Sequence, residues 1–323
     1  MTKTTIQWPL VLFSLLATGG AGILASMGLS EFHGVRRRTD FIALIVALIL
    51  IVVGGGLFVL STAQPSRMMA LLTNVSTGSM VSLEFLGCGV ALIVAVVYLF
   101  IKRAENPTAG KVIGVISVVV ALAFGFVAGF RYETMLGTPE WHTPTISLGF
   151  MLTSLLFGGF CYEFIASFGG QAKAADEVED ADADMGAGAK AAAGAKAPAG
   201  GADVNSRVAK DRSFSRAFAW ILTVLAALST ILYCVHIGMV DLTGNFVGYI
   251  LLVVVVGGAC SLLLSIAMVF KPQRYWVYIG FATTLVGGLA FRAFVYLVAN
   301  PHLLGQINNA MYAFTQTGGH FFA

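Results

Sequence analysis

The sequence predicts an all-α membrane protein, a bundle of eight transmembrane helices. Hydrophobic residues make up 58% of the 323 residues and charged residues only 11%, which is too few to cover the surface of a water-soluble domain. Eight apolar segments are also long enough to cross a hydrocarbon core, which takes about 20 residues of helix. These segments are residues 9–29, 41–61, 81–101, 112–132, 145–168, 216–237, 247–270 and 275–299.

The first segment is expected to be retained as a transmembrane helix. A cleaved signal peptide has its positive charges before the apolar run, whereas Arg36, Arg37 and Arg38 follow residues 9–29. Trp and Tyr side chains prefer the interfacial depth of a bilayer and mark the ends of the segments. They are Trp8, Tyr132, Trp141 and Tyr296 on one side of the membrane, and Tyr98, Trp220, Trp276 and Tyr278 on the other.

Positive charges are divided unequally between the two sides of the membrane. The connections after the first, third, fifth and seventh segments contain Arg36, Arg37, Arg38, Lys102, Arg103, Lys111, Arg207, Lys210, Arg212, Arg216, Lys271 and Arg274. The other side has only Lys3, Arg67 and Arg131. Because cytoplasmic loops carry the excess of Lys and Arg, we expect a multi-pass protein of the cytoplasmic membrane with both termini outside the cytoplasm.

Residues 170–213 interrupt the pattern of apolar segments. They are rich in Ala and Gly, with an acidic block followed by scattered lysines, and they offer no apolar face to bury. We expect a disordered cytoplasmic linker that acts as a tether, with partner binding as the alternative. The linker divides the chain into residues 1–169, with five helices, and residues 214–323, with three helices and an outer C-terminal tail. No sequence repeat relates these two parts, which argues against an inverted-repeat transporter.

Ionisable residues within the segments gather in the outer half of the predicted bundle. Glu84 lies near the outer start of the third segment, Arg131 at the outer end of the fourth, and Arg292 about two turns inside the eighth. A charged side chain in the hydrocarbon core is costly, so each of them marks a candidate functional site. In the inner half, Glu163 is expected to reach the nearby interface.

Each of these residues also has a purely structural interpretation. Arg131 can anchor a helix end at the headgroups, and Glu84 can be a neutral, hydrogen-bonded acid between helices. Arg292 can reach the interface or pair with Glu84. Taken together, they favour a quinol site at the outer face, with Arg67 contributed by the loop between the second and third segments.

A quinol site needs an apolar cavity, hydrogen-bond partners for two ring oxygens and an acceptor for the proton released on oxidation. Glu84 is the candidate acceptor, because a carboxylate shielded from water can take up a proton near neutral pH. Arginine can donate to a quinone oxygen. Ser61, Ser79 and Ser82 can supply further donors, although serines at helix ends more often act as caps.

The sequence offers no motif for a metal or a haem. Cys88, Cys161, Cys234 and Cys260 lie singly in apolar segments, without the CxxC spacing of iron–sulfur or zinc sites. A membrane cytochrome b needs facing axial histidines within its helices, and only His236 approaches a segment. We therefore expect this chain to bind neither haem nor metal.

Several stretches resemble the membrane anchor subunit of dimethyl sulfoxide reductase-type molybdoenzymes. They are QWPLVLFSLLATGGAGILA at the start, the SxxxPxR stretch of Ser61, Pro65 and Arg67 with Glu84 beyond it, FRYETMLGTPEWHTPTISLGFMLTSLLFGG, and GGLAFRAFVYL around Arg292. Eight helices with both termini outside also fit. The chain departs from the family at Ser61, where studied members have a histidine implicated in quinol binding. It also has one extra residue between Arg67 and Glu84, and the 170–213 linker.

The resemblance implies a subunit that oxidises menaquinol at the outer face and passes electrons to an iron–sulfur subunit docked there, which feeds a molybdopterin catalytic subunit. Iron–sulfur clusters and molybdopterin are thus expected in the partners, and this chain is expected to contact membrane lipid and no nucleic acid. The resemblance leaves open whether the subunit is quinol-oxidising or non-catalytic. Carried over by position, the site residues are Pro65, Arg67, Glu84, Arg131 and Arg292, with Ser61 in place of the histidine.

Two alternatives remain open. A secondary transporter would use Glu84, Arg131 and Arg292 to line a substrate path, and polar groups or broken helices would then be expected near the midplane. A structural anchor that has lost quinol chemistry would fit the serine at position 61.

Overall fold

The computed structural model describes residues 8–35, 37–61, 79–104, 106–134, 141–168, 201–239, 246–271 and 273–298, and these residues are folded almost entirely as helix. The elements are α1 (Trp8–Phe32), α2 (Asp40–Ser61), α4 (Met80–Arg103), α5 (Pro107–Glu133), α6 (Pro144–Ser167), α8 (Gly201–Met239), α9 (Phe246–Tyr249), η4 (Ile250–Cys260), α10 (Ser261–Phe270) and α11 (Arg274–Val298). Within them lie eight helices long and apolar enough to cross a membrane. The predicted fold class is confirmed, while the side on which the termini lie stays a prediction.

Helix starts follow from local sequence chemistry. Pro107 and Pro144 each occupy the first turn of their helix, where the missing N–H has no intrahelical role. The Asn106 side chain caps α5 by accepting hydrogen bonds from the backbone N–H groups of Thr108 and Ala109, both at 3.1 Å. The third to fifth spans therefore begin within a few residues of the predicted boundaries, apart from α5, which starts five residues earlier.

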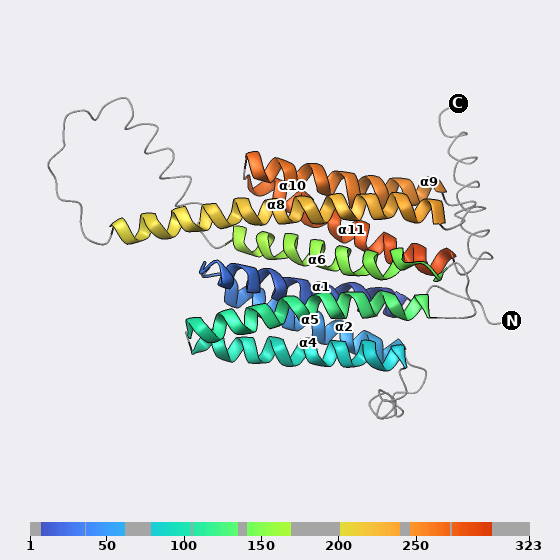
Figure 1. The fold of residues 1–323 in the computed structure, drawn as a ribbon, viewed down its shortest axis with the longest axis horizontal. Coiled ribbons are helices and arrows are strands. Elements are labelled where there is room, and N and C mark those ends of the chain that lie inside the picture. Colours follow the sequence, from blue (N-terminus) through green and yellow to red (C-terminus); the bar gives the residue numbers. More distant parts are fainter. Residues whose placement is uncertain are drawn as a thin grey trace, which may run out of the picture.

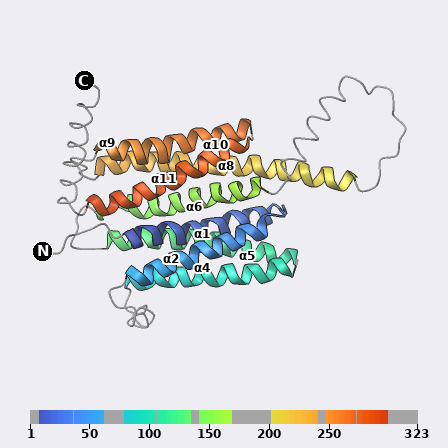
Figure 2. The same ribbon diagram turned by 180° about the vertical axis from the view of Figure 1, so that it is seen from behind.

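The helices form two groups of four that lie side by side (Figure 1). The first bundle consists of α1, α2, α4 and α5, and the second of α6, α8, α11 and the span made of α9, η4 and α10. In the view from behind, α1 and α6 again lie at the junction of the groups (Figure 2), and nearly every residue of α1 is buried. The fifth helix thus packs with the last three, so the 170–213 segment does not separate the two packing units.

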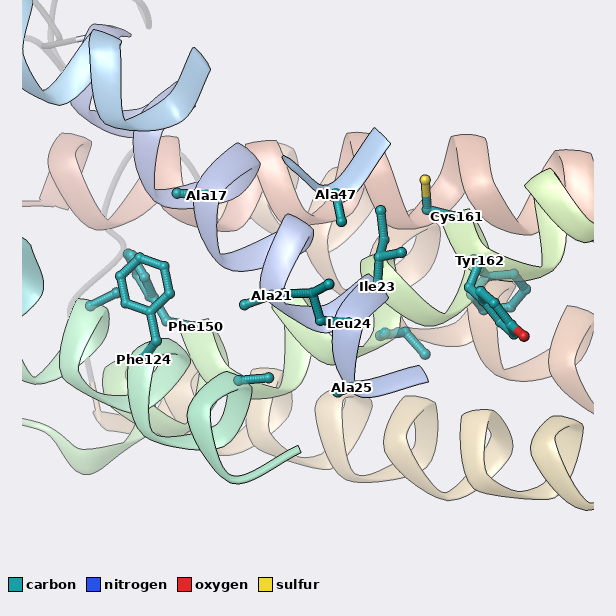
Figure 3. Close-up of a cluster of buried hydrophobic side chains, with 14 of the residues drawn as sticks. Ala17, Ala21, Ile23, Leu24, Ala25, Ala47, Phe124, Phe150, Cys161 and Tyr162 are labelled. Carbon is teal, nitrogen blue, oxygen red and sulfur yellow. The ribbon is translucent and has the colours of Figure 1, made fainter. Parts of the chain in front are cut away.

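Glycines make the closest contacts between helices. Gly22 of α1 packs on Gly158 of α6, and a Cβ atom at either position would overlap the facing backbone. Small side chains of α1, including Ala17, Ala21 and Ala25, lie among larger core side chains in the same region (Figure 3). Without a hydrophobic driving force between helices in lipid, such close backbone contacts supply much of the packing energy.

The helix α8 begins earlier than the sequence analysis predicted. Residues 201–213, expected to belong to the disordered linker, form its first turns, and α8 extends past its neighbours at that end (Figure 1). Two contacts explain the difference: Asp211 accepts a hydrogen bond from Arg37, and Phe214 is 2% exposed. The rest of the expected linker, residues 170–200, lies outside the described part of the chain.

Candidate functional site

A buried ion pair joins the start of α4 to the end of α5. Arg131 Nη1 donates to Glu84 Oε2 at 2.8 Å, and the Glu84 side chain has no exposed surface. The two groups meet because α4 and α5 pack against each other as antiparallel neighbours, so the first turns of one lie beside the last turns of the other. The sequence predicts both residues at the same membrane face, and the structure brings them into contact.

The ion pair has hydrogen-bonding capacity left over. Glu84 Oε1 and Arg131 Nε are buried and have no hydrogen-bond partner among the described residues, and the same holds for Ser82 Oγ nearby on α4. Most buried polar atoms in proteins are hydrogen-bonded, so unsatisfied atoms in one place need an explanation. A bound molecule, or residues outside the described part of the chain, would have to satisfy them.

The position of Arg131 is fixed by its two neighbours on α5. The Tyr132 hydroxyl shares a 2.5 Å hydrogen bond with the Tyr296 hydroxyl of α11, and Glu133 Oε1 accepts from the backbone N–H of Ser147 on α6 at 3.1 Å. Three consecutive residues thus tie the end of α5 to three different helices. The arginine is held against Glu84 by a rigid frame.

Arg292 lies apart from the ion pair. Its guanidinium donates to Thr153 Oγ1 at 3.0 Å, Ser154 Oγ at 2.8 Å and Thr18 Oγ1 at 3.2 Å, and it sits 4.7 Å from the centre of the Phe150 ring. It is fully buried, and within the described residues no carboxylate pairs with it. The structural alternative in which Arg292 pairs with Glu84 is wrong, because Glu84 pairs with Arg131. Arg292 instead joins α11 to α1 and α6.

Ser61 closes its own helix. Its hydroxyl donates to the carbonyl oxygen of Phe58 at 2.6 Å, as serines at helix ends often do. Phe58 stacks on Phe85, the residue next to Glu84, with 5.7 Å between ring centres. Ser61 therefore ends α2 beside the Phe58–Phe85 pair, and Phe85 adjoins Glu84 of the ion pair. Pro65 and Arg67 lie outside the described residues.

A second group of charges is buried at the opposite end of the bundle, where the sequence predicts basic connections but, inside the helices, only Glu163. We call it the Arg37 cluster, and it consists of Glu31, Arg37, Asp40, Lys102, Tyr162, Glu163 and Asp211. The expectation that Glu163 reaches toward the interface is wrong: it is 8% exposed and accepts from Arg37 Nη1 at 3.0 Å. Arg37 also donates to Asp211 at 2.8 Å and to Ser215 at 2.7 Å.

The Arg37 cluster continues through Asp40 to the first bundle. Asp40 accepts from Lys102 Nζ at 2.9 Å and from the Tyr162 hydroxyl at 2.9 Å, and Lys102 also pairs with Glu31. The cluster therefore connects α1, α2, α4, α6 and α8. One signal in the sequence could have revealed it, since Glu31 and Asp40 are acidic residues beside a basic loop.

Metal-binding groups are absent from the described part of the chain, in which no three or more His, Cys, Asp or Glu side chains are placed to hold an ion. Cys88, Cys161, Cys234 and Cys260 are all free thiols.

Eight membrane-spanning helices with a buried, incompletely satisfied ion pair near one end define a polytopic membrane protein with a candidate ligand site at that end. A family model gives the class more narrowly: residues 1–178 match the DMSO reductase anchor subunit (DmsC). Because the match covers more than half of the chain, the chain belongs to this family of membrane anchors for DMSO reductase-type enzymes. A comparison with curated proteins found no match. The matched residues include Glu84 and Arg131 and end before α8.

Proposed function

We propose that this chain anchors a molybdoenzyme complex in the cytoplasmic membrane and oxidises menaquinol at the Glu84–Arg131 pair. The observation that carries the proposal is the pair itself, which is buried and leaves one carboxylate oxygen and one guanidinium N–H unsatisfied. A quinol offers the matching groups, since each of its hydroxyls can both donate and accept a hydrogen bond.

Each residue has a separate role in the proposed reaction. Oxidation of menaquinol to menaquinone releases two electrons and two protons. Glu84 Oε1 would accept a hydrogen bond from one quinol hydroxyl and take up that proton as the electrons leave. Arg131, held by the Glu84 contact, would donate through Nε to the ring oxygen and favour its charged form. The serine, proline and arginine at positions 61, 65 and 67 remain candidates for the wall of the site.

The proposed partners follow from the family and from the charge distribution. An iron–sulfur subunit would dock on the outer face beside Glu84 and supply the electron acceptor, and a molybdopterin subunit would complete the complex. Exposed basic residues at the other end support a cytoplasmic location for that end and outer termini. They are Arg38, Arg103, Lys111, Lys210, Arg212 and Lys271.

The transporter alternative gains no support from the charges at the cytoplasmic end. That end holds more buried charge than the sequence suggests, yet the charged members of the Arg37 cluster are engaged in ion pairs with one another. These pairs lie at the ends of helices rather than at the midplane where a transport site is expected.

The Glu84→Gln variant tests the proposed function. We expect menaquinol-dependent reduction of the partner subunits to fall about 100-fold or more, because a positioned proton acceptor typically contributes that much, while the complex still assembles. Glu133→Gln is the matched control, since its side-chain oxygen can still accept from Ser147. Full turnover of an assembled Glu84→Gln complex would reject the proton-acceptor role and leave a structural anchor.

A further inference from the structure

The two bundles repeat one topology. In each, the four spans pack in a ring in chain order: α1, α2, α4 and α5 in the first, and α6, α8, the α9–η4–α10 span and α11 in the second (Figure 1). The end of the second span and the start of the third span therefore meet at the same end of each bundle. In the first bundle these positions hold Ser61 and Glu84. In the second they hold His236 and Tyr249.

The second bundle has buried polar groups at these positions. We call them the His236 cluster: Thr145, Ser229, Tyr233, His236 and Tyr249, none more than 4% exposed. Ser229, Tyr233 and His236 follow one another at spacings of four and three residues, so they share one face of α8. The ring centres of His236 and Tyr249 are 5.8 Å apart, and the Thr145 hydroxyl lies 2.7 Å from His236 Nδ1.

Unsatisfied donors concentrate here as they do at the Glu84–Arg131 pair. Tyr249 Oη and Ser229 Oγ are buried and have no hydrogen-bond partner among the described residues. Arg292 Nε is also buried and has no hydrogen-bond partner among the described residues. Arg292 follows Phe291, whose ring packs on those of His236 and Tyr233. Each buried hydroxyl without a partner costs the free energy of removing it from water, so a fold does not retain several without compensation.

The backbone is unusual at the same place. The 11 residues that follow Tyr249, Ile250–Cys260, form a π-helix, a conformation that is rare at this length and is often found at functional sites. Gly257 in its second half packs directly on Gly287 of α11. The π-helix thus begins directly after Tyr249, and its second half is fixed against α11.

We propose that the His236 cluster is a second binding site for a quinone ring, at the position in the second bundle that corresponds to the Glu84–Arg131 pair in the first. Tyr249 and Ser229 donate to the ring oxygens, His236 lies at its edge in the orientation set by Thr145, and Phe291 and Phe294 form the apolar walls. The evidence for a binding site here comes from the second bundle alone, whereas the choice of a quinone as its ligand rests on the proposed function.

The ligand class follows from the donor set. The unsatisfied hydroxyls are neutral, and aromatic side chains surround them, which suits a flat ring with two carbonyl oxygens. The nearest cation, Arg292, already donates four hydrogen bonds of 3.2 Å or less to hydroxyl and carbonyl oxygens. A small inorganic anion would find no comparable polar shell.

Photolabelling separates the two sites. The full-length chain, in lipid nanodiscs, would be saturated with a radiolabelled azido-naphthoquinone carrying a short prenyl chain, irradiated and mapped by peptide mass spectrometry. We expect two labelled regions, one in α4 and α5 and one between residues 229 and 256. Tyr249→Phe should reduce labelling of the second region about three- to tenfold at limiting probe, the contribution of one hydrogen bond, and leave the first unchanged.

Stability measurements exclude an indirect effect. The Tyr249 hydroxyl has no partner among the described residues, so Tyr249→Phe should leave the thermal unfolding temperature equal or higher, while a structural hydroxyl would lower it on removal. Tyr98→Phe, which removes the hydroxyl of a buried tyrosine in the first bundle, serves as the matched control. The proposal is overturned if residues 229–256 stay unlabelled, or if Tyr249→Phe and His236→Gln both label like the unaltered chain. Label in the second region with none near Glu84 would instead reject the proposed function alone.

Discussion

Removal of the Arg37 side chain tests whether the Arg37 cluster holds the two bundles together. Arg37 is 7% exposed and bonds to Glu163 of α6, to Asp211 and Ser215 of α8, and through its backbone N–H to Asp40. In Arg37→Met the aliphatic part of the side chain is kept and the charge is lost. Glu163, whose side chain is 10% exposed, then faces the core as an uncompensated carboxylate.

The expected loss of stability can be worked out from these contacts. Breaking a buried ion pair by removing one partner costs about 3–5 kcal/mol, chiefly because the remaining charge stays buried. Asp211 adds less, since its side chain is 28% exposed and can turn toward water. We therefore expect Arg37→Met to lower the free energy of unfolding by about 3–5 kcal/mol, measured by SDS titration of the full-length chain in mixed micelles.

Two further variants make the reasoning refutable. Arg38→Met alters the neighbouring arginine, which is exposed, and should change the free energy of unfolding by less than about 0.5 kcal/mol. Adding Glu163→Leu to Arg37→Met removes the stranded carboxylate and should restore part of the lost stability. If Arg37→Met proved as neutral as Arg38→Met, or if the double variant recovered nothing, the cluster would not act as a buried ion-pair network.

Three other outcomes follow from the packing and the ion pair. Gly158→Val should destabilise the fold by at least about 1–3 kcal/mol in the same titration, because the added atoms overlap the α1 backbone. Gly56→Val, where nothing lies within 4 Å, should not. Tyr132→Phe should cost about 0.5–1.5 kcal/mol through loss of its bond to the Tyr296 hydroxyl, and an unchanged titration would show that this bond contributes nothing. Arg131→Met should abolish menaquinol-dependent reduction as Glu84→Gln does, because it removes the partner that holds the carboxylate in place. Retained activity would show that Arg131 is not part of the site.

Helix positions could be predicted from the sequence because the thickness of the bilayer sets the length of a span and hydropathy marks where it lies. The third segment, for example, was predicted as residues 81–101 and is observed as Met80–Arg103. The start of α8 was missed for the opposite reason. Its first turns lie outside the apolar segment and are held by Arg37 and by the burial of Phe214, contacts that no local pattern reveals.

Within the candidate site, the sequence could indicate which residues lie close together only where chain topology determines their proximity. Glu84 and Arg131 lie at adjoining ends of consecutive helices, so their contact follows from the order of the spans. The surroundings of Arg292 come from α1 and α6, far away in the sequence, and could not be inferred from depth alone. The sequence places Arg37 with Arg36 and Arg38 in one basic connection, and a rule that counts arginines does not distinguish the one whose side chain is buried.

The central place of α1 has a consequence for the biogenesis of the protein. Because α1 is made before α6 and α11, the part of its surface that packs on them, with Gly22 against Gly158, must stay in lipid until they arrive. The helix α11, which follows the other described helices, carries Arg292, whose insertion alone would cost about 2.5–3.5 kcal/mol on the translocon scale. Its hydrogen-bond acceptors, Thr18, Thr153 and Ser154, are by then already in the membrane. The core therefore closes only when α11 inserts, and a chain cut short before α11 would leave the surfaces of α1 and α6 that bind Arg292 facing lipid.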